Sequence, residues 1–100
     1  MNPFFEDLGR RWAEAASKRG VSIEAPELDS EMALELLELA RVAAHTQERR
    51  FAPLASFMAG VAAERLRVAS GTSGAPGISA SELAEYVREV RQQLEREPPI

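Results

Sequence analysis

The sequence predicts an all-α protein: a single-domain antiparallel bundle of four helices at about residues 3–18, 30–47, 53–68 and 79–95. Apolar residues recur at helical spacing in four segments, and none of these shows the alternation typical of a strand. Residues that favour helix ends flank the segments, and the connections are short, as in antiparallel bundles. The chain of 100 residues is 45% hydrophobic, which is enough for one modest core.

The first helix has recognisable start and stop signals. Asn2 can cap it, with Pro3 at the first helical position. Its apolar face consists of Phe5, Leu8, Trp12 and Ala15. Gly20 is the expected stop, because glycine adopts the left-handed conformation without a steric penalty. The aromatic side chains are expected in the core or at its edge: Phe4, Phe5, Trp12 and Tyr86.

An irregular connection at residues 21–28 leads to the second helix, which Asp29 or Ser30 can cap. This helix has a broad apolar face, as expected of the central helix of a bundle. Its first turns carry glutamates without a basic partner: Glu31, Glu35 and Glu38. The acidic run from Glu24 to Glu38 is therefore interpreted as a solvated face, with a docking surface for a basic partner as the alternative.

The third helix is expected to begin at Pro53 and to have two different faces. Its apolar stripe consists of Leu54, Phe57, Met58, Val61 and Ala62. A second face carries small residues: Ser56, Gly60 and Ala63. Small residues let another backbone approach closely, so this face either packs within the chain, which is the default, or forms a self-association surface.

Residues 70–77 have the Gly/Ser-rich composition of a flexible linker before the last helix. Ser79 and Glu82 have the spacing of a capping box at the start of that helix. Its expected buried stripe consists of Leu83, Val87, Val90 and Leu94. Pro98 and Pro99 are expected to end it.

Composition excludes several classes of function. The net charge is −4 and the arginines are scattered, which argues against binding to nucleic acid. There is no cysteine, so thiol catalysis and thiolate metal sites are excluded. The N-terminus is not that of a signal peptide, and no run approaches the roughly 20 apolar residues that span a membrane. We therefore expect a cytoplasmic protein that binds neither nucleic acid nor membrane and needs no cofactor.

Chemistry, if present, is expected where the second and third helices meet. His45 is the only histidine, one turn after Arg41 and three residues before Glu48. Glu48 could orient its imidazole as a general base. The favoured interpretation is structural: His45 ties the end of the helix to the next turn by hydrogen bonds. No metal site is predicted, because the chain offers no further cluster of ligands beside His45 and Glu48.

Arg49 and Arg50 precede the start of the third helix, where free backbone amides can hold an anion. Pro53 removes one of those amides. The alternative is that Arg49 pairs with Glu48 or with the acidic face of the second helix.

The central segment resembles a small bacterial family of unknown function with the pattern LAR-x-x-AH-x-x-ER-x-x-APL-x-x-F-x-x-G-x-A-A. The matching residues extend from Leu39 to Ala63. In some members a similar domain is joined to a molybdenum-cofactor nucleotidyltransferase, and stand-alone members often inherit that name. The resemblance implies a short helical protein and marks five positions as the candidate binding site: Arg41, His45, Glu48, Arg49 and Pro53.

These observations together favour a non-catalytic accessory or protein-interaction module, which the resemblance links to molybdenum-cofactor biosynthesis. The expected partner is a protein, with a nucleotidyltransferase of that pathway as the first candidate; a two-fold homodimer is also open. The alternative is a small anionic-ligand-binding domain that uses Arg49 and His45. An enzyme with His45 as base ranks last, because no second catalytic group is recognisable.

Overall fold

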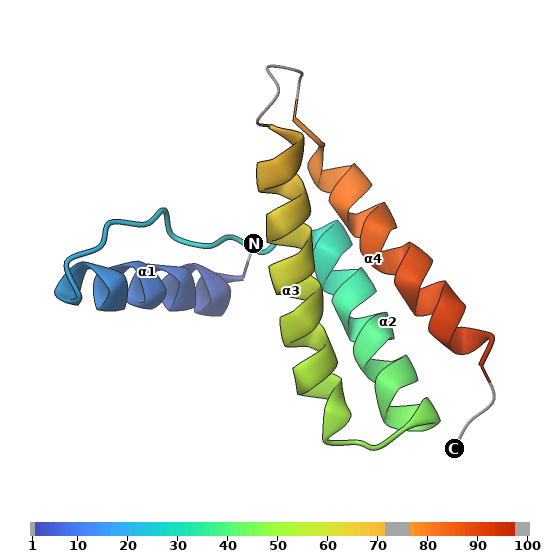
Figure 1. Cartoon of the computed structure of the whole chain (residues 1–100). Helices are drawn as coiled ribbons and strands as arrows, with labels where there is room; N and C mark the ends of the chain where they lie inside the picture. Colours follow the sequence, from blue (N-terminus) through green and yellow to red (C-terminus); the bar gives the residue numbers. More distant parts are fainter. Residues whose placement is uncertain (1, 72–76, 98–100) are drawn as a thin grey trace. The chain divides into compact units, whose positions relative to one another are not determined.

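The computed structural model describes residues 2–71 and 77–97, and the described part contains four α-helices and no strand. The helices are α1 (Pro3–Lys18), α2 (Ser30–Thr46), α3 (Phe51–Ser70) and α4 (Ala80–Glu95) (Figure 1). The predicted all-α class and the four predicted helices are confirmed. The largest difference is at α3, which begins at Phe51 instead of Pro53. Residues 72–76 of the predicted linker and the terminal prolines lie outside the described residues.

The chain divides into two compact units, Met1–Ser30 and Glu31–Ile100. In the first unit, the side chain of Asn2 accepts a hydrogen bond from the amide of Phe4, and Pro3 is the first residue of α1. At the other end Gly20 has a φ of 80°, and its amide donates to the carbonyl of Ser17 while that of Val21 donates to Ala16. Both predicted ends of α1 are therefore confirmed, the second as a Schellman motif.

The segment that follows α1 runs back along the helix at Gly9. A Cβ added at Gly9 would lie 2.5 Å from the carbonyl oxygen of Pro26, so no larger residue fits without a backbone shift. Trp12, Ile23 and Pro26 line one apolar concavity there. The aromatic side chains of this unit are nevertheless exposed, so the prediction that they lie in the core or at its edge is wrong for Phe4, Phe5 and Trp12.

The second unit contains the three remaining helices and the hydrophobic core. A short turn joins α2 to α3, which run in opposite directions, and α4 packs beside them (Figure 1). The buried apolar side chains come from all three helices: Leu39, Val42, Ala43, Ala63, Ala84 and Val87. The predicted capping box of α4 is present, with Ser79 and Glu82 each accepting from the other's backbone amide.

Helix α3 packs by its small side chains and exposes its large ones. Its buried and half-buried side includes Ala55, Ala59, Ala62 and Ala63. Its exposed side carries Leu54, Phe57 and Met58, which are 61%, 72% and 70% exposed and which we call the outer ridge. The prediction that these three residues form the inner stripe is therefore wrong, because the alanines let α3 approach its neighbours and occupy that place. Similarly, Val90 of α4 is exposed while Val87 is buried.

Candidate functional site

At the turn between α2 and α3, the charged residues do not gather around His45 as the sequence suggests. Arg41 forms an ion pair with Glu38, one turn earlier on α2, with a 2.9 Å contact. Glu48 accepts from Arg50 at 2.6 Å. Both pairs are solvent-exposed, so each contributes little to stability. Neither Arg41 nor Glu48 is paired with His45.

His45 lies near the C-terminal end of α2 with an exposed side chain. Within residues 2–71 and 77–97 its imidazole makes no hydrogen bond or ion pair. The hydrogen bonds expected of a structural His45 are therefore not formed, and neither is the Glu48 contact that would orient a general base. Thr46, the next residue, does form a side-chain hydrogen bond: its hydroxyl donates to the carbonyl of Val42 at 2.8 Å.

The start of α3 offers few free amides to an anion. The amide of Phe51 donates to the carbonyl of Glu48 at 3.0 Å, and that of Ala52 donates to Arg49 at 3.2 Å. Pro53, the third residue of α3, has no amide hydrogen. The side chain of Arg49 is exposed and, in the described part of the chain, makes no ion pair, so the expected Arg49–Glu48 pair is not formed. An anion here would be held by side chains alone.

One face of α2 combines apolar and polar side chains in an exposed row. Leu34 and Leu37 are 64% and 68% exposed. Arg41 and His45 continue the row at spacings of four residues, so all four share one helix face. We call these four residues the α2 face. The sequence predicts a broad apolar α2, but it does not show which leucines remain uncovered.

A cluster of ion pairs and hydrogen bonds joins α2 to α4, and it was not predicted from the sequence. Glu35 is buried and accepts from the guanidinium groups of Arg88 at 2.7 Å and Arg91 at 3.1 Å. Arg91 also contacts Glu95 at 2.6 Å. Glu31 accepts from Ser81 at 2.9 Å. The prediction that these glutamates lack basic partners is therefore wrong, since Glu31 also lies 3.8 Å from Arg88 and Glu38 pairs with Arg41. The prediction of a solvated face is wrong at Glu35, which is buried.

Two opposing effects act on the pKa of Glu35. Burial raises it, while the hydrogen bonds and charges of Arg88 and Arg91 lower it, and the net result is a pKa below the ordinary value. The only hint in the sequence is the spacing of Arg88 and Arg91, which places both on one face of α4. Because their partner lies more than 50 residues earlier, local pattern alone does not reveal it.

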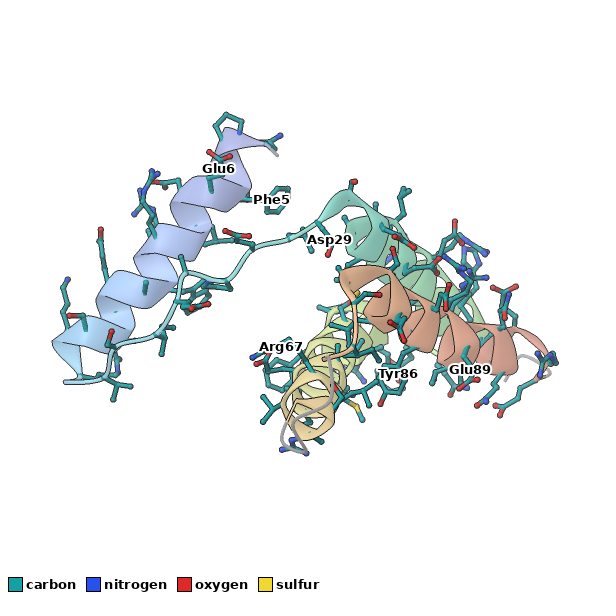
Figure 2. The ribbon with its side chains drawn as sticks, turned by 90° about the horizontal axis from the view of Figure 1, so that it is seen from above. Phe5, Glu6, Asp29, Arg67, Tyr86 and Glu89 are labelled. Carbon is teal, nitrogen blue, oxygen red and sulfur yellow. The ribbon has the colours of Figure 1, made fainter. Side chains whose placement is uncertain are left out.

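A predominantly apolar groove lies between α3 and α4, with Leu39 of α2 among its lining residues. Its volume is about 260 Å³. The walls are formed by Ala55, Met58, Ala59 and Ala62 of α3 and by Tyr86, Val87, Val90 and Leu94 of α4. Tyr86 projects from α4 on the side of α3 (Figure 2). Such a lining suits an apolar side chain and not a charged substrate.

Two absences among the described residues bear on the class of protein. Residues 2–71 and 77–97 contain no group of three or more histidine, cysteine, aspartate and glutamate side chains placed to hold a metal ion. In the same residues, none of the helices combines the length and the apolar character needed to cross a membrane.

These features define a small all-helical domain with an apolar groove and no assembled set of catalytic groups among its described residues. The chain belongs to the family described as "Domain of unknown function (DUF6457)", whose model matches residues 6–99. The predicted membership of a family of unknown function is confirmed, and the match carries no link to molybdenum-cofactor enzymes. Comparison with curated proteins finds no match. Comparison with solved structures also finds none.

Proposed function

We propose that this protein is a non-catalytic protein-interaction module that binds its partner by the α2 face. The observation that carries the proposal is the exposure of Leu34 and Leu37 beside Arg41 and His45. Apolar side chains bordered by charged ones are typical of protein contact surfaces, whose centre is apolar and whose rim is polar. Glu48 and Arg49 follow the α2 face in the chain and extend the polar rim, and Pro53 lies exposed in the first turn of α3.

The arrangement of the polar groups supports binding over catalysis. A general base needs a partner that orients it and a second group that assists the reaction. His45 has no hydrogen-bonding partner within the described residues, and the neighbouring Arg41 and Glu48 are paired elsewhere. The first partner to test is a molybdenum-cofactor nucleotidyltransferase, which the family resemblance suggests. Such a role would place the protein in the cytoplasm.

The test is calorimetric titration of the purified chain into that nucleotidyltransferase. The native chain is expected to bind with micromolar affinity, and Leu37→Glu is expected to weaken binding at least tenfold because it places a charge in the apolar centre. Gln92→Ala, an exposed change on α4, is the matched control and should bind as the native chain does. Absence of binding at about 100 µM removes this partner. Unchanged binding by Leu37→Glu removes the α2 face.

The second candidate is a small anionic-ligand-binding domain that uses Arg49 and His45. It is favoured by one observation: both side chains are exposed and, among the described residues, engage no other group. Phosphate, nucleotides and pterins should then raise the thermal midpoint of the native chain by mass action, but not that of Arg49→Ala. No shift at millimolar ligand would argue against it.

A further inference from the structure

The face that helix α3 turns to the core is the opposite of the one expected for a helix in a monomeric bundle. A surface helix normally turns its bulky apolar side chains to the core and its small or polar ones to water. Here the alanines face the core, and the outer ridge of Leu54, Phe57 and Met58 faces outward. Contiguous exposed apolar surface of this kind marks a contact with another molecule.

The outer ridge lies next to the apolar groove between α3 and α4. Met58 belongs to both, since it is part of the ridge and also lines the groove. An apolar cavity of about 150 Å³ is large enough to accept benzene. The groove, at about 260 Å³, therefore has room for the ring of a phenylalanine and part of a neighbouring side chain.

We propose that a second copy of this chain covers this face, with the outer ridge of each copy seated in the α3–α4 groove of the other. A two-fold dimer requires a self-complementary patch, in which the protrusion and the recess that receives it occur on the same surface. The ridge and groove meet this requirement because they share Met58. Phe57, the most exposed side chain of the ridge, would be the main anchor.

The available apolar area suits this occupant. The three ridge side chains are each more than 60% exposed, and Phe57 and Met58 lie three and four residues after Leu54 on α3, so they form one continuous apolar patch. A stable interface buries about 800 Å² on each partner. Each copy contributes its ridge and also the walls of its groove, including the exposed Val90, so the symmetric contact is smaller than that and fits a dimer of micromolar affinity.

This inference goes beyond the proposed function and uses a different surface. The outer ridge and the groove involve α3 and α4, whereas the α2 face consists of Leu34, Leu37, Arg41 and His45. Dimerisation and binding of a protein partner can therefore be lost independently. Phe57→Glu is designed to abolish the first and Leu37→Glu to weaken the second.

The first test is the mass of the full chain in solution, measured by light scattering and sedimentation from about 1 to 200 µM. The native chain is expected to reach about 22 kDa, twice its 11.0 kDa. Phe57→Glu is expected to remain at 11.0 kDa with unchanged circular dichroism, because Phe57 is exposed within its own unit. Leu37→Glu is the matched control on α2 and should dimerise normally. A native chain that stays monomeric overturns the proposal, and so does a Phe57→Glu dimer.

A second test locates the contact. The chain has no cysteine, so a single introduced cysteine is the only site for a thiol-specific cross-linker. Met58→Cys is expected to give a covalent dimer with a short bis-maleimide, and Leu37→Cys, equally exposed but on α2, is expected to stay monomeric. Equal cross-linking at the two positions would overturn the placement of the interface on α3.

Discussion

Different interactions stabilise each of the two compact units of this chain. Among the described residues of Met1–Ser30, Gly9 is the buried one, and the aromatic side chains are exposed. In Glu31–Ile100, six apolar side chains of the described part, from three helices, are buried together. The first unit therefore relies on helix caps and one close backbone approach, and the second on packing between helices. A helix of 16 residues is marginal without tertiary packing, so the two units should respond differently to mutation.

The largest expected effect comes from the core of the second unit. Leu39→Ala should lower the free energy of unfolding by about 3 kcal/mol, because the side chain is 5% exposed and its removal leaves a cavity. Leu37→Ala, two residues away and largely exposed, is the matched control and should change stability by less than about 0.5 kcal/mol. Urea unfolding followed by circular dichroism measures both. Equal losses of unfolding free energy for the two variants would contradict the different burial of Leu39 and Leu37.

The buried ion-pair cluster should give the next largest effect. Glu35→Ala leaves Arg88 and the mostly buried Arg91 without their shared carboxylate. We expect a loss of about 2–3 kcal/mol, less than for a fully buried pair because Arg88 keeps contact with water. Glu38→Ala breaks only the exposed pair with Arg41 and should cost less than about 0.5 kcal/mol. A Glu35→Ala protein as stable as Glu38→Ala would contradict the assignment of this cluster.

The same cluster should make stability depend on pH. The pKa of Glu35 in the folded state lies below its ordinary value, so its contribution is present above the unfolded-state pKa and is lost as the pH falls through the folded-state pKa. Between pH 7 and pH 3, the free energy of unfolding should therefore fall more steeply with decreasing pH for the native chain than for Glu35→Gln. Parallel curves for the two proteins would rule out this source of acid sensitivity.

A smaller and local effect is expected in the first unit. Gly9→Ala places a methyl group against the carbonyl of Pro26 and should cost about 1–2 kcal/mol of local stability by overpacking. Trp12 is the only tryptophan and lies in that unit, so its emission reports the change directly. Gly60→Ala, in the other unit, should leave the emission unchanged. Identical emission spectra for Gly9→Ala and the native chain would show that the close approach is absent in solution.

The smallest effect is a gain. Gly60 lies inside α3, and a Cβ at this position would meet no atom within 4 Å. Gly60→Ala should therefore raise the free energy of unfolding by about 0.5–1 kcal/mol through helix propensity alone. Thermal unfolding of the monomeric Phe57→Glu background measures this gain without a contribution from self-association. A loss of stability there would place another group against Gly60.

The features that were predicted correctly are local ones. Asn2, Gly20 and the capping box of Ser79 and Glu82 act within a few residues of the chain, so their spacing in the sequence is sufficient to recognise them. The helices themselves follow from apolar periodicity. The position of α3 was missed by two residues because Pro53 is tolerated anywhere in the first turn, not only at its first position.

The features that were missed depend on residues far apart in the chain. Periodicity shows that α3 has a large apolar side and a small side, but not which one faces α2 and α4. The pairing of Glu35 with Arg88 and Arg91 joins helices separated by more than 50 residues. The five candidate site residues remain a prediction: the structure places them on the exposed turn and its flanks, with Arg41 and Glu48 in separate ion pairs.

Hydrogen exchange of the full-length chain tests most directly whether the stable core lies in residues 31–100. Amides of α2 and α4 around Val42 and Val87 should exchange only by global unfolding, because these residues are buried between helices. Amides in the middle of α1 should exchange at least about 100-fold faster through local opening. Protection of α1 equal to that around Val42 and Val87 would contradict the account and show that both units unfold as one.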